Sequence, residues 1–162
     1  MLLYIVRHAW AGQHGDPAYP DDSLRPLTKK GEKRFRRVAK RLVKRGLSPC
    51  HVATSPLVRC RQTADVLMHY VGGKAELAVL KELVPGARLE PLLPWLRQQQ
   101  EGDIALVGHA PDVSHLLLAF IGGTSGHIDM EKGAVAAINF NGAVEPGTGT
   151  LEWLATADML GV

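Results

Sequence analysis

The 162-residue sequence holds only two cysteines, and aromatic residues make up 6% of it. Cys50 and Cys60 lie ten positions apart, a spacing that fits neither a disulfide framework nor a zinc knuckle, so we expect two reduced thiols. The apolar run at the start, MLLYIVRHAW, is far shorter than a membrane span and has neither the basic lead nor the cleavage site of a signal peptide. We therefore expect a cytoplasmic protein that does not enter a membrane.

Metal-ligand spacings and base-stacking aromatic clusters are also missing. Most of the histidines stand without a carboxylate or cysteine partner at metal-ligand spacing; these are His14, His51, His69, His115 and His127. The three tryptophans are too scattered along the chain to form a stacking platform for bases. We therefore expect no metal and no cofactor, and nucleic acid is not a favoured partner.

The composition is that of a globular chain, with 46% hydrophobic and 22% charged residues. A length of 162 residues fits one domain, which we place over residues 1–162. The sequence has no long apolar surface stretch that a partner subunit would have to bury, so a monomer is the expected state.

Positive charge is concentrated in one segment. Residues 28–46 hold ten of the 19 Lys and Arg residues and a single acid, Glu32. The remaining 9 basic and 15 acidic residues give the rest of the chain a net charge of −6. This basic segment could face an acidic protein, a nucleic acid or only water, and a solvated face is the simplest interpretation.

Buried-strand patterns alternate with helical periodicity along the chain. The expected strands cover residues 2–7, 51–55, 75–80, 103–108, 134–140 and 150–155. Four helices are expected. The first follows Thr28 and extends as far as Gly46, and the second starts at Ser55-Pro56 and runs to about Tyr70. The third covers residues 89–100, and the fourth runs from Pro111 or Asp112 to Gly122. This alternation predicts an α/β fold, a three-layer α/β/α sandwich with a mostly parallel central sheet and a final antiparallel pair. Ligands of such sheets bind beyond the carboxyl ends of the strands.

Cationic and imidazole side chains fall at that edge. Arg7 and His8 follow the first strand, Arg59 lies in the first turn of the helix after the second strand, and His109 follows the fourth strand. Guanidinium groups hold phosphate oxygens in a bidentate way, and a neutral imidazole can attack phosphorus. The residues therefore predict a phosphoryl site.

Four sequence blocks carry a family resemblance. YIVRHAW, RPLTKKGEKR, TSPLVRCRQTA and LVGHAP stand in the same order as the blocks of the histidine phosphatase superfamily, also called phosphoglycerate mutase-like. The short chain, the opening RHA and the RPLT block resemble most the compact SixA-type phosphohistidine phosphatases. Ala9 departs from the usual glycine of the signature, and alanine disfavours positive φ, so this position must lie in an ordinary backbone region or carry strain.

The resemblance implies roles for the matching residues. His8 would be the nucleophile, Arg7 and Arg59 would clamp the phosphoryl oxygens, and His109 would donate a hydrogen bond to one of them. The resemblance implies a further contact from Arg25. The backbone N–H of Ala110 is an additional candidate donor.

A general acid is harder to assign from the sequence. Glu82, which follows the third strand, stands near the point where related phosphatases and mutases carry an acidic residue, although a plain surface glutamate is equally compatible with its position. Asp16, Asp21 and Asp22 in the first loop are less favoured alternatives.

The implied activity is that of a metal-independent phosphatase with a phosphohistidine intermediate on His8. The favoured substrate is phosphohistidine on a protein, as in a histidine-phosphotransfer domain. Small phosphate esters or nucleotides are the alternative substrates. A different class of function, a non-catalytic module that binds nucleic acid or an acidic protein through the basic segment 28–46, also stays open at this stage.

Overall fold

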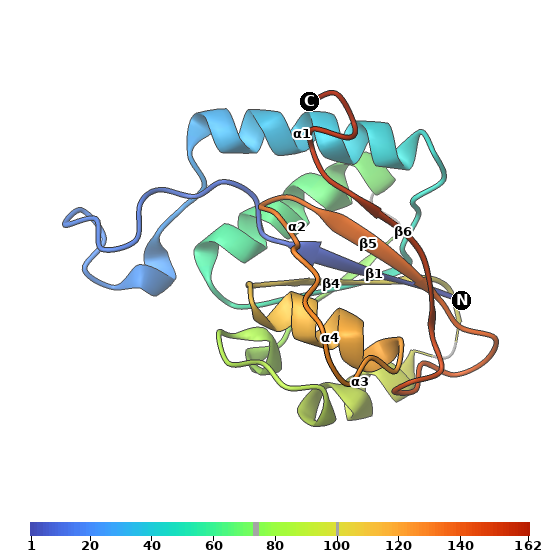
Figure 1. The fold of residues 1–162 in the computed structure, drawn as a ribbon. Helices are drawn as coiled ribbons and strands as arrows, with labels where there is room; N and C mark the ends of the chain where they lie inside the picture. The colour runs from blue at the N-terminus through green and yellow to red at the C-terminus, as the bar shows by residue number, and fades with distance from the viewer. Residues whose placement is uncertain (73–74, 100) are drawn as a thin grey trace.

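Six strands form one sheet with helices on both faces (Figure 1), in a computed structural model that describes residues 1–72, 75–99 and 101–162. The strands are β1 (Leu2–Arg7), β2 (His51–Thr54), β3 (Glu76–Val79), β4 (Ile104–Gly108), β5 (Val135–Asn139) and β6 (Thr150–Ala155). The α-helices are α1 (Lys29–Val43), α2 (Val58–Val71), α3 (Leu93–Gln98) and α4 (Asp112–Phe120), and the 3₁₀ turns are η1 (Asp22–Leu24), η2 (Lys81–Leu83) and η3 (Glu90–Leu92). The predicted α/β class is confirmed.

The sheet is mixed and mostly parallel, with the strand order β3-β2-β4-β1-β5-β6. β1 pairs with β4, and β2 pairs with both β3 and β4, all in parallel. β5 runs antiparallel to β1 and to β6, so the predicted antiparallel pair at the end of the chain is confirmed. The carboxyl ends of β1, β4 and β2 therefore meet side by side at one edge of the sheet.

The strand β1 separates two hydrophobic cores. Successive side chains of a strand point to opposite faces, so Tyr4 and Val6 join the core under α1 and α2, whereas Leu3 and Ile5 join the core under α3 and α4. All four side chains are buried. The run of apolar residues in β1 is therefore explained by helices packed on both faces of the sheet.

The helix α1 begins and ends where the sequence predicts. The Thr28 side chain caps it, because its Oγ1 accepts a hydrogen bond from the Gly31 N–H at 2.9 Å. Phe35 and Leu42 are among the buried side chains that face the sheet, and the basic residues occupy the other side. Gly46, just past the end, has a φ of +100°, a conformation that glycine adopts at little cost.

Two helix predictions need correction. The helix predicted to start at Ser55-Pro56 begins at Val58, because Ser55 still belongs to the connection after β2 and its hydroxyl is engaged elsewhere. The segment 89–100 opens as the 3₁₀ turn η3 before the short helix α3, since its prolines at 91 and 94 cannot donate backbone hydrogen bonds. The predicted end at residue 100 lies outside the described residues.

Candidate active site

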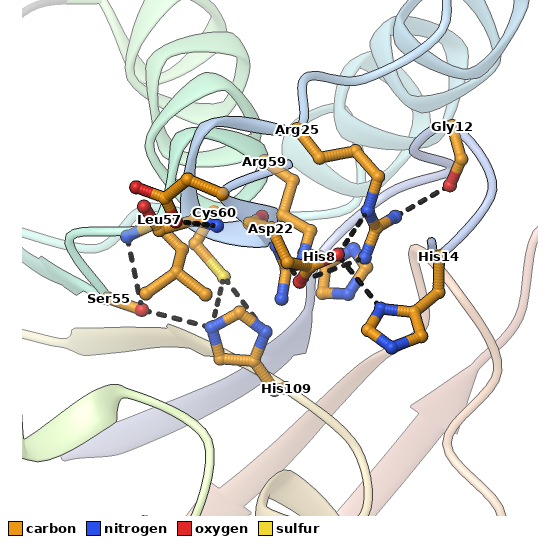
Figure 2. A network of polar contacts seen from close by, with 12 residues as sticks. His8, Gly12, His14, Asp22, Arg25, Ser55, Leu57, Arg59, Cys60 and His109 are labelled. Carbon is orange, nitrogen blue, oxygen red and sulfur yellow. Dashed lines mark hydrogen bonds and ion pairs between the residues drawn. The ribbon is translucent and has the colours of Figure 1, made fainter. Parts of the chain in front are cut away.

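The register of the central strands places the predicted residues at one edge of the sheet. Arg7, the last residue of β1, lies opposite Gly108 of β4. The next residue of each strand is a histidine, and the His8 N–H donates to the Gly108 carbonyl at 3.0 Å. Arg59 stands in the first turn of α2, which follows β2. Figure 2 shows His8, Arg59 and His109 together with Arg25, so the structure brings these side chains to the same edge of the sheet.

His8 is buried, with 8% of its surface exposed. Its Nδ1 lies 2.7 Å from the Ala9 carbonyl oxygen, which can only accept, so Nδ1 carries the proton and the lone pair stands on Nε2. Burial is the main cause that lowers the pKa of His8 to about 4; the guanidinium groups of Arg59, Arg7 and Arg25 act in the same direction, and the hydrogen bond to Ala9 opposes them. Near pH 7 the ring is therefore neutral and nucleophilic at Nε2.

The backbone around His8 is unstrained. Among the described residues no residue other than glycine has a positive φ, so Ala9 lies in an ordinary region. The Ala9 N–H donates to the Thr63 hydroxyl at 3.0 Å, and this hydroxyl donates to the Arg59 carbonyl at 2.7 Å. The same threonine therefore ties the turn after β1 to the helix that carries Arg59.

His109 lies beside His8, with ring centroids 5.3 Å apart and ring planes inclined at 62°. Its Nε2 is 2.9 Å from the Ser55 hydroxyl and 3.4 Å from the Cys60 sulfur. Burial lowers the pKa of His109 to about 3, and the neighbouring His8 and Arg59 act in the same direction. This environment favours the neutral ring, and a bound anion would raise the pKa again.

Arg7, which is half-buried, and Arg59, which is buried, both bring guanidinium groups to the cluster. Arg59 donates to the Asp22 carbonyl at 2.9 Å, and Arg7 donates to the Met130 carbonyl at 2.7 Å. Burial lowers the pKa of each, yet both stay charged near pH 7 because an arginine starts from 12.5. In the described part of the chain, the buried Nε atoms of both side chains have no hydrogen-bond partner. Such fixed and incompletely paired donors suit the oxygens of a phosphoryl group.

Arg25 is held by a residue whose role the sequence did not indicate. Its Nε donates to the Asp22 carboxylate at 2.7 Å, and one terminal nitrogen donates to the Gly12 carbonyl at 2.6 Å. The same carboxylate pairs with Arg59 at 3.2 Å and with His14 at 2.9 Å. The hydrogen bond from Arg25 holds the pKa of Asp22 well below its usual range. An ionised carboxylate has no proton to give, so Asp22 fits a clamp on the arginines better than a general acid.

Glu82 lies in η2, directly after β3, and is half-buried. The neighbouring loop is joined to the start of α4 because the Gly86 N–H donates to the Asp112 carboxylate at 2.9 Å. This contact brings the segment with Glu82 to the side of the site that carries His109. No hydrogen bond or ion pair of the Glu82 carboxylate occurs among the described residues, and its role as general acid stays a prediction.

Ala110 follows His109 at the same edge of the sheet. None of the backbone hydrogen bonds found between described residues uses its N–H, which therefore remains available as a donor. Its contact with a phosphoryl oxygen also stays a prediction.

Ser55 and Cys60 are the contacts of His109 that sequence reasoning missed. Ser55 was expected to cap α2, but its hydroxyl lies against His109, and Leu57 stands at the cap position without a side-chain hydrogen bond. Cys60 is fully buried, as expected of a small hydrophobic residue, and burial raises the pKa of its thiol to about 12, so it remains a neutral thiol. The available signal was the position of Ser55, which directly follows β2, because β2 is adjacent to β4 and His109 directly follows β4.

Within the described ranges, no three His, Cys, Asp or Glu side chains gather in a way that could hold a metal ion. Nor do the described helices include one that is long and apolar enough to cross a membrane. Two imidazoles surrounded by guanidinium groups thus define a site for a phosphoryl group on an α/β fold.

Comparison with known proteins agrees with this class. Residues 3–84 match the family described as Histidine phosphatase superfamily (branch 1). An uncharacterized protein of Picosynechococcus sp. is 36% identical over 151 residues, which cover 88% of this chain and 87% of that protein. The chain therefore belongs to the histidine phosphatase superfamily, branch 1, and is a hydrolase of that superfamily that acts on a phosphorylated substrate.

Within the superfamily the chain is similar to SixA proteins. It is 27% identical over 158 residues to the phosphohistidine phosphatase SixA of Escherichia coli (strain K12), across 94% of this chain and 92% of that protein. The solved structure of the protein histidine phosphatase SixA complexed with tungstate superimposes with a TM-score of 0.86 at 23% identity, over 99% of both chains. The whole fold, including the mostly parallel sheet, is thus SixA-like.

Proposed function

We propose that this protein removes phosphate from phosphohistidine on a protein, through a covalent intermediate on His8 and without a metal ion. The observation that carries the proposal is the state of His8: a buried neutral imidazole whose Nδ1 proton is bound to the Ala9 carbonyl 2.7 Å away, beside the cationic Arg7 and Arg59. An imidazole fixed in this tautomer offers its Nε2 lone pair to phosphorus.

In the first step, the His8 Nε2 attacks the phosphorus atom while the bond from phosphorus to the substrate's ring nitrogen breaks. Arg7, Arg59 and Arg25 hold the three phosphoryl oxygens, and their fixed charge stabilises the transition state without reorganisation. His109 and the Ala110 N–H donate to the same oxygens. The Ala9 carbonyl stabilises the positive charge that His8 gains on phosphorylation.

Proton transfer completes both steps. The leaving imidazole nitrogen takes a proton from the Glu82 carboxyl, and water then attacks the phosphorus of phosphorylated His8 and returns a proton to Glu82. The bond between His8 and phosphorus breaks, and inorganic phosphate leaves. Because a protonated imidazole is a good leaving group, the first step depends less on Glu82 for phosphohistidine than it would for an alkyl phosphate.

Similarity supports protein phosphohistidine over small esters as the substrate. The phosphohistidine phosphatase SixA of E. coli aligns with 94% of this chain. The two proteins are also similar in size, because the alignment covers 92% of SixA.

A comparison of substrates tests the proposal. With a chelator present, the protein should release phosphate from a phosphohistidine-containing protein and from free phosphohistidine faster than from phosphoserine or p-nitrophenyl phosphate. His8→Ala should lose at least 10³-fold in turnover with an unchanged melting temperature, because it removes the nucleophile. The matched control is His115→Ala, an exposed histidine of α4, which should keep full turnover.

Rapid quenching with ³²P-labelled substrate checks the intermediate. Label that is stable to alkali and labile to acid should accumulate on His8. Full turnover in His8→Ala, or acid-stable label on a serine, would contradict the mechanism. Preferential hydrolysis of p-nitrophenyl phosphate or a nucleotide would instead support the small-ester alternative.

A further inference from the structure

The exposed side of α1 carries a continuous row of cations. Six of them are exposed and follow one another at helical spacing, and we call them the basic face: Lys29, Lys30, Lys33, Arg37, Lys40 and Lys44. At a rise of 1.5 Å per residue, this row is about 22 Å long. It is the one prominent sequence feature that the phosphoryl site does not use.

The acids on the rest of the chain leave the basic face uncompensated. Arg36 pairs with Glu32 and Arg34 pairs with Asp158, but both of these arginines lie beside the basic face. Among the ion pairs of the described residues, none involves a cation of the basic face itself. The sequence outside segment 28–46 carries a net charge of −6, so acids are present on the molecule but are placed elsewhere.

This arrangement works against the stability of the helix. Lys33 stands four residues from both Lys29 and Arg37, and like charges at this spacing destabilise a helix. Lys29 and Lys30 also stand in the first turn, where the helix dipole disfavours positive charge. A surface that serves solubility alone would interleave charges of both signs.

The basic face begins at the rim of the active site. The Thr28 N–H, just before α1, donates to the carbonyl of Trp10 at 3.0 Å, and Trp10 stands two residues after His8. The guanidinium of Arg34 covers the Trp10 ring at 4.3 Å. An open hollow of about 460 Å³ lies along the helix from this point; it is lined by Lys30, Lys33, Arg34, Arg37 and Val162.

We propose that the basic face docks an acidic surface of the protein whose phosphohistidine enters the active site. This docking presupposes the function proposed above and adds the chemistry of the partner: carboxylates spread over about 20 Å beside the phosphorylated histidine. Electrostatic complementarity of this kind speeds encounter and selects the partner.

The surroundings favour an acidic protein over a nucleic acid or a lipid surface. Asp129 and Glu131 lie close enough to Arg7 to raise the pKa of its guanidinium, in opposition to burial. Negative charge therefore also lies near the active site, beside the positive charge of the basic face. A long or flat polyanion would also meet such acids, whereas a small protein can place its carboxylates along α1 alone. Trp10, at the start of the basic face, is covered by Arg34, which makes it unsuited to base stacking.

Two synthetic peptides test the docking. Each has 20 residues and one central phosphohistidine formed with phosphoramidate; one carries six glutamates around it and the other six glutamines. At 20 mM NaCl the KM for the glutamate peptide should be at least tenfold lower than for the glutamine peptide. At 0.5 M NaCl the difference should fall below twofold, because salt screens exposed charges.

Charge reversal identifies the surface. Lys33→Glu/Arg37→Glu should raise the KM for the glutamate peptide at least tenfold, with kcat and the turnover of free phosphohistidine within twofold of the original. Its melting temperature should be equal or higher, because residue 33 then attracts Lys29 and residue 37 attracts Arg41 at the same four-residue spacing, while residues 33 and 37 still repel each other. The matched control is Arg61→Glu/Arg88→Glu, which makes the same change of charge at exposed positions outside α1 and should keep the low KM.

Binding of the unphosphorylated, fluorescein-labelled glutamate peptide, followed by anisotropy, separates docking from catalysis. If phosphohistidine is not hydrolysed at all, the proposed function fails, and this binding still reports on the basic face. An unchanged KM and affinity in Lys33→Glu/Arg37→Glu would overturn the docking surface. Tighter binding of a 20-nucleotide oligonucleotide or of phosphatidylserine vesicles through the same two residues would overturn the choice of an acidic protein.

Discussion

His8 and His109 have pKa values of about 4 and about 3, below the 6.5 of an exposed histidine, chiefly because both rings are buried. In the unfolded chain both rings regain the higher value. Between pH 6.5 and 4 the unfolded state therefore binds protons that the folded state does not, and the free energy of unfolding falls as the pH falls.

This linkage predicts how His8→Asn changes the pH dependence of stability. From pH 7 to pH 5 the contribution of one such histidine falls by about 2 kcal/mol. The variant should therefore lose about 2 kcal/mol less than the original protein over this range, as measured by urea denaturation at pH 7, 6 and 5. His115→Asn, at an exposed position, should follow the original curve. Identical slopes for His8→Asn and the original would show that His8 is not buried in its neutral form.

Sequence reasoning placed His8, Arg59 and His109 because each follows or lies just beyond a strand with a clear apolar pattern. It could not assign Ser55 and Asp22 to their contacts. Ser55 meets His109, 54 positions away, and Asp22 meets Arg59, 37 positions away. Such contacts depend on the conformation of the loops that carry these residues, and irregular loops have no periodic sequence pattern from which it could be predicted.

The elements that the sequence predicted best are those in which the hydrophobic periodicity of the segment agrees with its burial or its capping in the folded protein. β1, β4 and α1 combine a single periodicity with burial or a cap, and their observed bounds match the expectation closely. The start of α2 was wrong because Ser55, a good cap by composition, serves His109 in place of the helix. Local preferences, such as that of serine for helix N-caps, fail to predict the structure where a residue makes a contact in the active site.

Gly31 gives a prediction at the scale of the helix. In a helix, alanine is ordinarily more stable than glycine by about 1 kcal/mol. Here a Cβ would overlap the Trp10 carbonyl oxygen and lie 2.7 Å from the Trp10 Cβ. Gly31→Ala should therefore lower the free energy of unfolding by about 2 kcal/mol. It should also lower phosphatase turnover, because Trp10 stands two residues after His8.

Urea denaturation and phosphate release measure the two effects. Lys30→Ala, the preceding exposed residue, serves as the control and should change the stability by less than about 0.5 kcal/mol. A stabilised Gly31→Ala variant would mean that α1 and the turn after His8 can move apart freely.

The molecule as a whole is a sheet with a core on each face, and β1 contributes to both cores. The alternation of strands and helices was sufficient to predict these three layers. The strand order could not be predicted in this way. It depends on the edge of the sheet at which each crossover connection adds its next strand, and the sequences of the separate segments carry little information on that position. The shared strand leads us to expect that the two cores unfold together.

Phe120→Ala tests this coupling. Phe120 is fully buried and packs edge-to-face against Phe140, with centroids 5.8 Å apart, so its loss should cost about 3–5 kcal/mol. Unfolding followed by circular dichroism and by tryptophan fluorescence should show one coincident transition, moved to lower urea. Leu77→Ala, on the edge strand and 41% exposed, should change the stability by less than about 0.5 kcal/mol. Two separated transitions would show that the layers are independent.

The Asp22 carboxylate has a consequence for how the reaction cycle ends. It contacts Arg25 at 2.7 Å and Arg59 at 3.2 Å, two of the side chains that the proposed mechanism assigns to the phosphoryl oxygens. Under that mechanism, binding of substrate would exchange one anion for another, with Asp22 as the protein's own counter-ion. Its carboxylate would then compete with the product phosphate for the two guanidinium groups and so limit inhibition by the product.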